Sequence, residues 1–323
     1  MRDTLGRTID YLRISVTDRC NLRCVYCMPA EGVPYKDHSQ ILSYEEVVRL
    51  VSAGAKLGIC RIRLTGGEPL VRADIVQLVR ELKKIPGIDD IAITTNGVLL
   101  PPLATELKAA GLDRVNISLD TLRPERFAAV TRIGSLEAAI EGIEAALAAD
   151  FHPVKINTVA LAGLNDDEIP DLAALTLKYP LHVRFIEVMP LGDDVNWAKN
   201  HMLSLREVRS RVETVGQLVP AMVTGAGPAQ AFKFKSGLGT VGFIAAMSHG
   251  FCHRCNRLRL TADGKLKPCL ASDQEVDVRE ALRQGANQEV LKTLFARAIA
   301  LKPSEHRLQQ YEQHERIMSQ IGG

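Results

Sequence analysis

Three cysteines near the amino terminus have the spacing of iron–sulfur ligands. Cys20, Cys24 and Cys27 form a C-x3-C-x2-C pattern in a segment that we expect to be a loop. A four-iron cube normally takes one thiolate on each iron, so three thiolates leave one iron open for chemistry. A structural zinc closes its shell with four protein ligands, and the nearest downstream imidazole, His38, is poorly placed to be the fourth. The pattern therefore favours an open iron–sulfur cluster over a zinc site or a stiffened loop.

A second group of three cysteines lies toward the carboxyl terminus. It comprises Cys252, Cys255 and Cys269. Asp263-Gly264 is a hairpin turn signal between two short predicted strands, and such a hairpin brings Cys269 back beside the first pair. Taken alone the group is ambiguous, because His249 or His253 would complete a zinc site of three cysteines and one histidine.

Two arginines beside the second cysteine group favour an iron–sulfur cluster there as well. Arg257 and Arg259 flank Leu258 in a predicted strand, and alternate residues of a strand share one face. A structural zinc needs no such cations. An open iron that faces a polyanionic substrate does.

Length and composition indicate a soluble enzyme with one large domain. The chain has 323 residues, of which 46% are apolar, and a single α/β barrel commonly uses roughly 200 to 250 residues. We place the barrel domain at residues 1–215 and a smaller extension at 216–323. No internal repeat is evident.

Charge and targeting signals narrow the location and the partners. Forty Lys and Arg residues against 38 Asp and Glu residues give a net charge of +2, too near balance for nucleic-acid or membrane binding through bulk electrostatics. Residues 1–10 lack the apolar core of a signal peptide, and no stretch reaches the roughly 18 apolar residues of a membrane span. We therefore expect a cytoplasmic protein. The seven cysteines fit a reducing compartment, and Cys60, outside both groups, is expected to be a small core residue.

Short β patterns alternate with longer helical patterns, which is typical of βα units around a parallel sheet. The predicted strands span residues 11–16, 60–64, 90–95, 114–119, 154–160 and 183–188. The predicted helices span residues 43–57, 72–84, 103–110, 135–149, 167–178 and 205–212. Six units are fewer than the eight of a closed barrel. We therefore predict an α/β fold, an incomplete (β/α)6 TIM-like barrel whose open side is closed by a smaller C-terminal α+β extension.

The predicted strands have one apolar face and one polar face. The polar positions are Arg13, Ser15, Arg63, Thr65, Thr94, Asn96, Asn116, Ser118, Asp120, Lys155 and Asn157. Because burying such groups without partners costs on the order of 2–7 kcal/mol each, water or a large polar ligand must fill this interior. Arg13, Arg63 and Lys155, together with Arg257 and Arg259, would suit a triphosphate. For any single one of them a paired or solvated charge is the simpler interpretation, so the argument depends on their shared face.

A diglycine element ends the second predicted strand. Gly66-Gly67-Glu68-Pro69 follows that strand at its carboxyl end, where α/β barrels build their active sites. The two glycines allow the backbone to approach a ligand closely. A Gly-Gly pair by itself indicates only a turn.

Together these motifs resemble those of the radical S-adenosylmethionine enzymes. With the second cysteine group, Arg257-Leu258-Arg259 and the final Gly322-Gly323, the resemblance narrows to the GTP 3',8-cyclase family, also called molybdenum cofactor biosynthesis protein A. It extends over essentially the whole chain and is weakest at residues 216–237. The family fold and chemistry imply two [4Fe-4S] clusters, one on each cysteine group, and S-adenosylmethionine bound at the open iron of the first.

The resemblance also implies roles for individual residues. The positions matching family contacts to S-adenosylmethionine are Tyr26, Gly67, Ser118 and Met189, with core packing as the alternative for Met189. The positions matching GTP contacts are Arg13, Arg63, Thr94, Lys155, Arg257, Leu258 and Arg259. Arg13 is also a candidate for assisting the late reduction of the nucleoside. The diglycine end of the chain reaches the active site in this family.

The implied reaction is radical chemistry on GTP. A 5'-deoxyadenosyl radical, made from S-adenosylmethionine, takes hydrogen from C3' of the ribose, and the carbon radical attacks C8 of guanine. One further electron and a proton give 3',8-cyclo-7,8-dihydro-GTP, the first step toward the molybdenum cofactor. The implied partners are an electron donor such as flavodoxin or ferredoxin, the downstream cyclic pyranopterin monophosphate synthase, and a second copy of the chain in a homodimer.

Two other functions fit part of the pattern. A radical S-adenosylmethionine enzyme that modifies peptides and carries an auxiliary cluster would have a similar amino-terminal half, but Arg257, Arg259 and the diglycine end argue against it. A non-catalytic iron–sulfur or zinc protein would leave the polar interior and Gly66-Gly67 without purpose. Tight GTP binding excludes the first alternative, and 5'-deoxyadenosine formation excludes the second.

Overall fold

One twelve-stranded sheet runs through the molecule, in the strand order β12-β11-β10-β1-β2-β3-β4-β5-β6-β9-β8-β7. A computed structural model describes residues 1–34, 36–191, 194–225, 227–248, 250–311 and 314–322. The central strands are β1 (Tyr11–Ser15), β2 (Arg61–Thr65), β3 (Asp90–Thr95), β4 (Arg114–Ser118), β5 (Val154–Ala160) and β6 (Leu181–Glu187). Each pairs in parallel with the next. The six predicted strands and the parallel α/β sheet are therefore confirmed.

Strands from the carboxyl-terminal part of the chain lengthen both edges of this sheet. On one edge β10 (Arg257–Leu260) pairs in parallel with β1, followed by antiparallel β11 (Lys265–Lys267) and β12 (Val276–Asp277). On the other edge β9 (Thr240–Ile244) pairs in parallel with β6, followed by antiparallel β8 (Gln230–Phe234) and β7 (Leu218–Pro220). The predicted hairpin at Asp263-Gly264 joins β10 to β11, and Gly264 has φ +79°. The extension thus continues the curve of the sheet from both sides.

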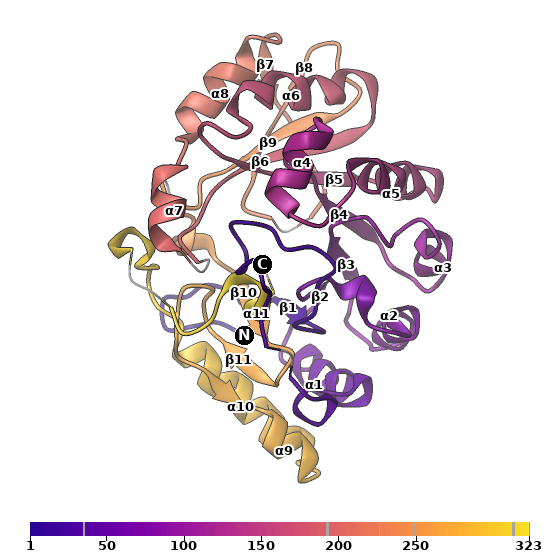
Figure 1. The fold of residues 1–323 in the computed structure, drawn as a ribbon. Coiled ribbons are helices and arrows are strands. Elements are labelled where there is room, and N and C mark those ends of the chain that lie inside the picture. The colour runs from indigo at the N-terminus through magenta and orange to yellow at the C-terminus, as the bar shows by residue number, and fades with distance from the viewer. Residues whose placement is uncertain (35, 192–193, 226, 249, 312–313, 323) are drawn as a thin grey trace.

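The helices ring the outside of the curved sheet, and the carboxyl terminus lies near its centre (Figure 1). The six predicted helices are present as α1 (Tyr44–Ala55), α2 (Ile75–Lys83), α3 (Ala104–Ala109), α5 (Leu136–Ala148), α6 (Ile169–Lys178) and α8 (Leu205–Glu213). Further helices are α4 (Pro124–Thr131), α7 (Val195–Asn200), α9 (Arg279–Arg283), α10 (Gln288–Ala300) and α11 (Met318–Ile321). Short 3-10 turns are η1 (His38–Gln40), η2 (Pro69–Val71), η3 (Asp166–Glu168), η4 (Cys252–Arg254) and η5 (Leu308–Gln310). None of the helices in the described ranges is long and apolar enough to cross a membrane.

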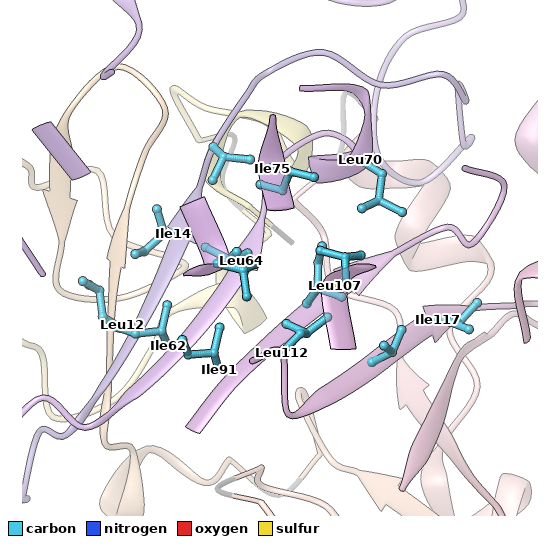
Figure 2. Close-up of a cluster of buried hydrophobic side chains, with 14 of the residues drawn as sticks. Leu12, Ile14, Ile62, Leu64, Leu70, Ile75, Ile91, Leu107, Leu112 and Ile117 are labelled. Atoms are coloured by element: carbon cyan, nitrogen blue, oxygen red, sulfur yellow. The ribbon is translucent and has the colours of Figure 1, made fainter. Parts of the chain in front are cut away.

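Alternation along the strands separates the core from the interior chamber. Figure 2 shows the apolar residues of neighbouring strands packed together, among them Leu12, Ile62 and Ile91, all essentially unexposed. Full burial of such a side chain stabilises the fold by about 1.5–3 kcal/mol. The residues between them, such as Arg63 and Lys155, are also buried but share the opposite face of the sheet. That face lines the candidate site.

Candidate active site

Three arginines on neighbouring strands lie side by side on one wall of the chamber. Arg13 of β1 is in register with Arg259 of β10 on one side and with Arg63 of β2 on the other. Because neighbouring strands are about 4.8 Å apart, these side chains form a continuous cationic row. Burial, followed by the charge of Arg259, holds the pKa of Arg13 well below its usual value. Burial and Arg257 lower the pKa of Arg259 to about 10.

A second set of cations faces this row from β4, β5 and β6. Burial and the charge of Arg184 lower the pKa of Lys155 to about 7, and burial together with Arg63 lowers the pKa of Arg184 to about 9. The Nη2 group of Arg184 donates to the Asn116 side-chain oxygen at 2.7 Å. The predicted cations Arg13, Arg63 and Lys155 are therefore brought together.

Arg114 and Arg184 belong to the same chamber but were not among the residues selected from the sequence. Arg184 occupies a polar-face position of β6, in register with Asn157, so the alternation that identified Lys155 could have identified it. Arg114 begins β4 and pairs with the carboxylate of Asp90, a contact between two strands that the sequence alone does not indicate.

Several polar atoms on these walls have no hydrogen-bond partner among the described residues. They are buried and include the Nε atoms of Arg63 and Arg184, Thr94 Oγ1 and Asn157 Oδ1. Burying a polar group or a charge without a partner is costly. A bound polyanion with several oxygen acceptors would satisfy the guanidinium donors and offset the repulsion between the cations.

The carboxyl terminus enters this chamber. The Gly322 carbonyl accepts hydrogen bonds from Arg259 Nη1 and, at 3.4 Å, from Arg13 Nη2. A Cβ on Gly322 would lie 2.6 Å from Thr65 Cγ2, and Gly322 has φ +70°, so a residue with a side chain would not fit there. Gly322 thus contacts two of the residues predicted to bind GTP, whereas Gly323 lies outside the described residues.

The first cysteine group lies on the loop after β1. Cys20, Cys24 and Cys27 are all half-buried. Burial raises the pKa of the Cys20 thiol to about 11, and burial with the proximity of Cys20 raises that of Cys27 to about 12. The loop is held by α4, because the amides of Arg23 and Val25 donate to the carbonyls of Thr131 and Val130.

These thiols fit an iron–sulfur cluster. As bare thiolates they would repel one another in a poorly solvated loop, and the positive iron atoms of a cube would remove that cost because metal ions deprotonate coordinating thiols. Within the described ranges, no three His, Cys, Asp or Glu side chains converge on the position of one metal ion. A cube takes each thiolate at a different iron and so accepts more widely spaced ligands.

Gly66 and Gly67 fix the cysteine loop against β2. A Cβ on Gly67 would lie 2.3 Å from the carbonyl oxygen of Arg19. The Gly67 amide donates to the Thr17 carbonyl at 2.9 Å, and the Glu68 amide to the Arg19 carbonyl at 2.8 Å. The close approach expected for a ligand is thus made by the loop backbone itself.

We expect Gly67→Ala to weaken the loading of the first cluster, because the new methyl group would push the 17–19 backbone away. Such overpacking destabilises a protein by about 1–3 kcal/mol. Gly216→Ala is the matched control, since its added Cβ meets only Phe234 at an ordinary 3.5 Å. Iron content and thermal unfolding of both variants check the prediction, and equal iron content would contradict it.

A pocket beside the first cysteine group brings together two residues predicted to contact S-adenosylmethionine. Tyr26 and Ser118 both line it, together with Cys24, Asn96 and Asp120. The Tyr26 hydroxyl donates to Asp120 Oδ2 at 2.6 Å, which orients the ring. Burial raises the pKa of Asp120 to about 6. The pocket therefore offers an aromatic face and polar groups directly beside Cys24 of the first cysteine group.

The second cysteine group is held by β10, β11 and a buried lysine. Cys255 lies two residues before β10, and Cys269 follows β11 by two residues. Lys302 donates through Nζ to the carbonyls of Arg257 and Pro268, both at 2.7 Å. Burial alone would raise the pKa of Cys255, but the charges of Arg257 and Lys302 lower it to about 6. The thiolate of Cys255 is therefore favoured, as a cluster requires, whereas burial raises the pKa of the Cys252 thiol.

The sequence offers two histidines, His249 and His253, as candidate zinc ligands for the second group. His253 lies in η4 and is exposed, whereas His249 lies outside the described residues. Lys302 was not selected from the sequence, because it follows α10 and approaches the cysteines only through tertiary packing.

Three other candidate residues have defined surroundings. The Leu258 side chain is unexposed and belongs to the main apolar core, so a contact with GTP would fall to its backbone. Met189 packs against the small cluster of Leu191, Met247 and Leu308, which agrees with the alternative of core packing. Thr94 is in register with Asn116 on the chamber wall.

Comparisons with known proteins give consistent results. The profile of the Radical SAM superfamily matches residues 14–176, and that of Molybdenum Cofactor Synthesis C matches residues 181–308. The chain is 53% identical to a GTP 3',8-cyclase of Heliobacterium modesticaldum and 54% identical to one of Pelotomaculum thermopropionicum, with 100% of each chain covered. Among solved structures it is similar to Streptococcus suis SuiB bound to S-adenosylmethionine, with a TM-score of 0.63 and 15% identity over 89% of this chain and 68% of that one.

Proposed function

Because this chain belongs to the GTP 3',8-cyclase family of radical S-adenosylmethionine enzymes, we propose that GTP lies in the cationic chamber between two clusters. The activity is radical cyclisation of GTP in molybdenum cofactor biosynthesis. The first cysteine group holds the [4Fe-4S] cluster of the superfamily, and we assign a second cluster to Cys252, Cys255 and Cys269. The row formed by Arg259, Arg13 and Arg63 is the observation that carries this proposal.

The first cluster, when bound, supplies the electron that cleaves S-adenosylmethionine into methionine and a 5'-deoxyadenosyl radical. The protein's own residues then position the reactants. Tyr26, oriented by Asp120, packs against the adenine, and Ser118 contacts the same cofactor from the pocket wall. Gly67 holds the cysteine loop in place. Met189, which is only partly buried against its apolar neighbours, is a further proposed contact with S-adenosylmethionine.

The chamber cations bind the triphosphate. Arg13, Arg63 and Lys155 line its floor, Arg184 faces them, and Thr94 offers a hydroxyl without a partner among the described residues. Arg257 and Arg259 approach from the second cysteine group, so the guanine would face that group while the ribose faces the first. Arg13 is close enough to the tail and to Arg259 to act on the nucleoside during the last reduction.

The division of the chain follows from these roles. We propose residues 1–215 as the part that generates the radical and residues 216–323 as the part that holds the second cluster and the diglycine tail. Flavodoxin or ferredoxin as electron donor, cyclic pyranopterin monophosphate synthase as the downstream enzyme, and a homodimer remain proposals that rest on family membership.

Anaerobic incubation with GTP, S-adenosylmethionine and dithionite tests the whole proposal. Mass spectrometry should find the cyclised nucleotide together with 5'-deoxyadenosine. Formation of 5'-deoxyadenosine without any change to GTP would refute the assigned substrate.

A peptide-modifying enzyme is the second candidate, because SuiB, which has a similar fold, has also been solved with the precursor peptide SuiA bound. At 15% identity this likeness concerns the fold alone. The two relatives described above, at 53% and 54% identity, are GTP 3',8-cyclases, and a chamber lined by several buried cations suits a nucleotide better than a peptide. A non-catalytic electron carrier would have no use for such a chamber.

Lys155 predicts a pH dependence of GTP binding. With a pKa of about 7 in the free protein, Lys155 is mostly neutral at pH 8, and a bound triphosphate would favour its charged form. Binding should then take up close to one proton, and affinity should rise by up to about tenfold per unit as pH falls from 9 toward 7. Above pH 8 the terminal phosphate is fully ionised and does not obscure the effect.

Calorimetry in two buffers of different ionisation enthalpy measures this proton uptake. Lys155→Arg is the matched control, because even Arg184, with its pKa of about 9, stays mostly protonated at pH 8, so an arginine at position 155 should bind GTP there with little proton uptake. Equal proton uptake by the two proteins would contradict the assignment of Lys155 to the triphosphate.

A further inference from the structure

The segment that carries the diglycine has little structure of its own. It ends in α11, a helix of four residues, and a single turn is not stable in isolation. The Met318 amide donates to the Leu191 carbonyl at 3.0 Å, and His314 lies 3.2 Å from the Asp273 carboxylate. Asp273 is 40% exposed, so solvent weakens that contact. Ile321 and Ser319 are buried and Met318 packs beside Leu191, so packing helps to hold Gly322 against Arg259 and Arg13, and the polar anchors of the segment add to it.

Arg316 is the best-anchored polar side chain of this segment. Its Nη1 and Nη2 donate to the two carboxylate oxygens of Asp263 at 3.2 and 3.1 Å. Its Nε and Nη2 contact the two oxygens of Glu275 at 2.6 and 2.9 Å. The Arg316 side chain is 16% exposed and that of Asp263 only 6%. A planar guanidinium that grips two carboxylates in this way is geometrically defined, unlike a typical surface ion pair.

The two carboxylates belong to the hairpin of the second cysteine group. Asp263 is in the turn between β10 and β11, where it also accepts from Thr261 Oγ1 at 2.6 Å. Glu275 precedes β12 and pairs with Lys267 of β11 at 3.1 Å. Arg316 therefore ties the tail to the strands that carry Arg259 and lead to Cys269.

The same carboxylate reaches the loop of the first cysteine group. Lys36 Nζ lies 2.9 Å from Asp263 Oδ2, and the Lys36 amide donates to Asp18 Oδ2 at 3.0 Å. Asp18 precedes Cys20 by two residues. Asp263 is thus the point where the tail, the hairpin of the second group and the loop of the first group meet.

We propose that Arg316 is a positioning residue for the reaction: by binding Asp263 and Glu275 it sets Gly322 of the C-terminal diglycine against Arg259 and Arg13. Five residues separate Arg316 from Gly322, and α11 takes up four of them as one turn, so a shift at Arg316 is passed on to Gly322. This inference rests on the proposed function for its effect on turnover. The placement of the tail itself can be measured without turnover.

The first test is hydrogen exchange of the carboxyl-terminal peptide in the full-length protein. Arg316→Gln removes the charge and keeps most of the length, while Asp263 retains Lys36 and Thr261, and Glu275 retains Lys267, so the hairpin should stay folded. We expect exchange in residues 317–322 to speed up at least tenfold. Arg209→Gln is the matched control, because Arg209 forms an exposed pair with Glu213 on α8, and it should leave that peptide unchanged.

The second test is kinetic and uses a chain that lacks residues 322–323. In the full chain Arg316→Gln should lower kcat for cyclisation roughly tenfold at unchanged iron content, and Arg316→Lys should recover part of it. In the truncated chain the same substitution should change kcat less than twofold, because the diglycine it positions is gone.

The outcomes separate this inference from the proposed function. If Arg316→Gln leaves both exchange and kcat at wild-type values, or lowers kcat equally in the full and truncated chains, Arg316 does not act through the tail. If wild-type protein makes no cyclised nucleotide, the function fails, while the exchange result still decides whether Arg316 holds the tail.

Discussion

A Cys24→Ala enzyme is expected to form no detectable 5'-deoxyadenosine, a loss of at least about a thousandfold, because a cube with only two protein thiolates would not remain in the loop. Cys24 is the central member of the first group. Burial and the proximity of Cys27 raise the pKa of its thiol well above the usual value. The thiolate is therefore unfavourable in this site unless iron is bound to it. Anaerobic product analysis by mass spectrometry measures the effect.

Cys60→Ala is the matched control for this prediction. Cys60 is half-buried, like Cys24, but belongs to neither group, and it should keep full 5'-deoxyadenosine formation. The iron content of Cys24→Ala should fall by about four per chain, the content of one cube, while that of Cys60→Ala stays at the wild-type value. Wild-type rates in Cys24→Ala would show that the first group is not the radical centre.

The sheet and the floor of the chamber were accessible from the sequence because both depend on local alternation. Period-two patterns located all six central strands, and the same pattern placed Arg13, Arg63 and Lys155 on one face. The register of the strands then places these residues next to one another, because parallel neighbours bring equivalent positions together. Arg184 follows the same rule in β6 and could have been found in the same way.

Features that depend on long-range packing were not accessible in this way. The sequence predicts that Gly66-Gly67 lets the backbone approach a ligand, but it does not indicate that these glycines also make room for the backbone of residues 17–19, some fifty positions away. Lys302 reaches the second cysteine group only after α10 has packed against the sheet. β9 and β10 pair in parallel with the central strands at opposite edges of the sheet. The sequence gives no local signal for this, because the residue pattern of a strand does not indicate which strand it pairs with.

The second cysteine group carries the other large prediction. In Cys255→Ala we expect iron to fall from about eight to about four per chain, since the first group is built on a separate loop and keeps its cube. Cleavage of S-adenosylmethionine should continue, because Tyr26, Ser118 and Gly67 are untouched. Cyclised nucleotide should fall at least about a hundredfold, as GTP would lose the iron that we propose binds it beside Arg257 and Arg259.

The experiment distinguishes between arrangements because it measures cleavage of S-adenosylmethionine and cyclisation of GTP separately. A protein with a single functional cluster would lose nothing in Cys255→Ala. A protein in which the second group merely stabilises the fold would lose both activities together, and its unfolding temperature would drop. Only an arrangement in which the first group makes the radical and the second holds the substrate predicts 5'-deoxyadenosine without cyclisation. Because Lys302 and Arg257 remain in place beside the vacant position, a Cys255→Ala chain still folded around its first cluster should show that uncoupling directly.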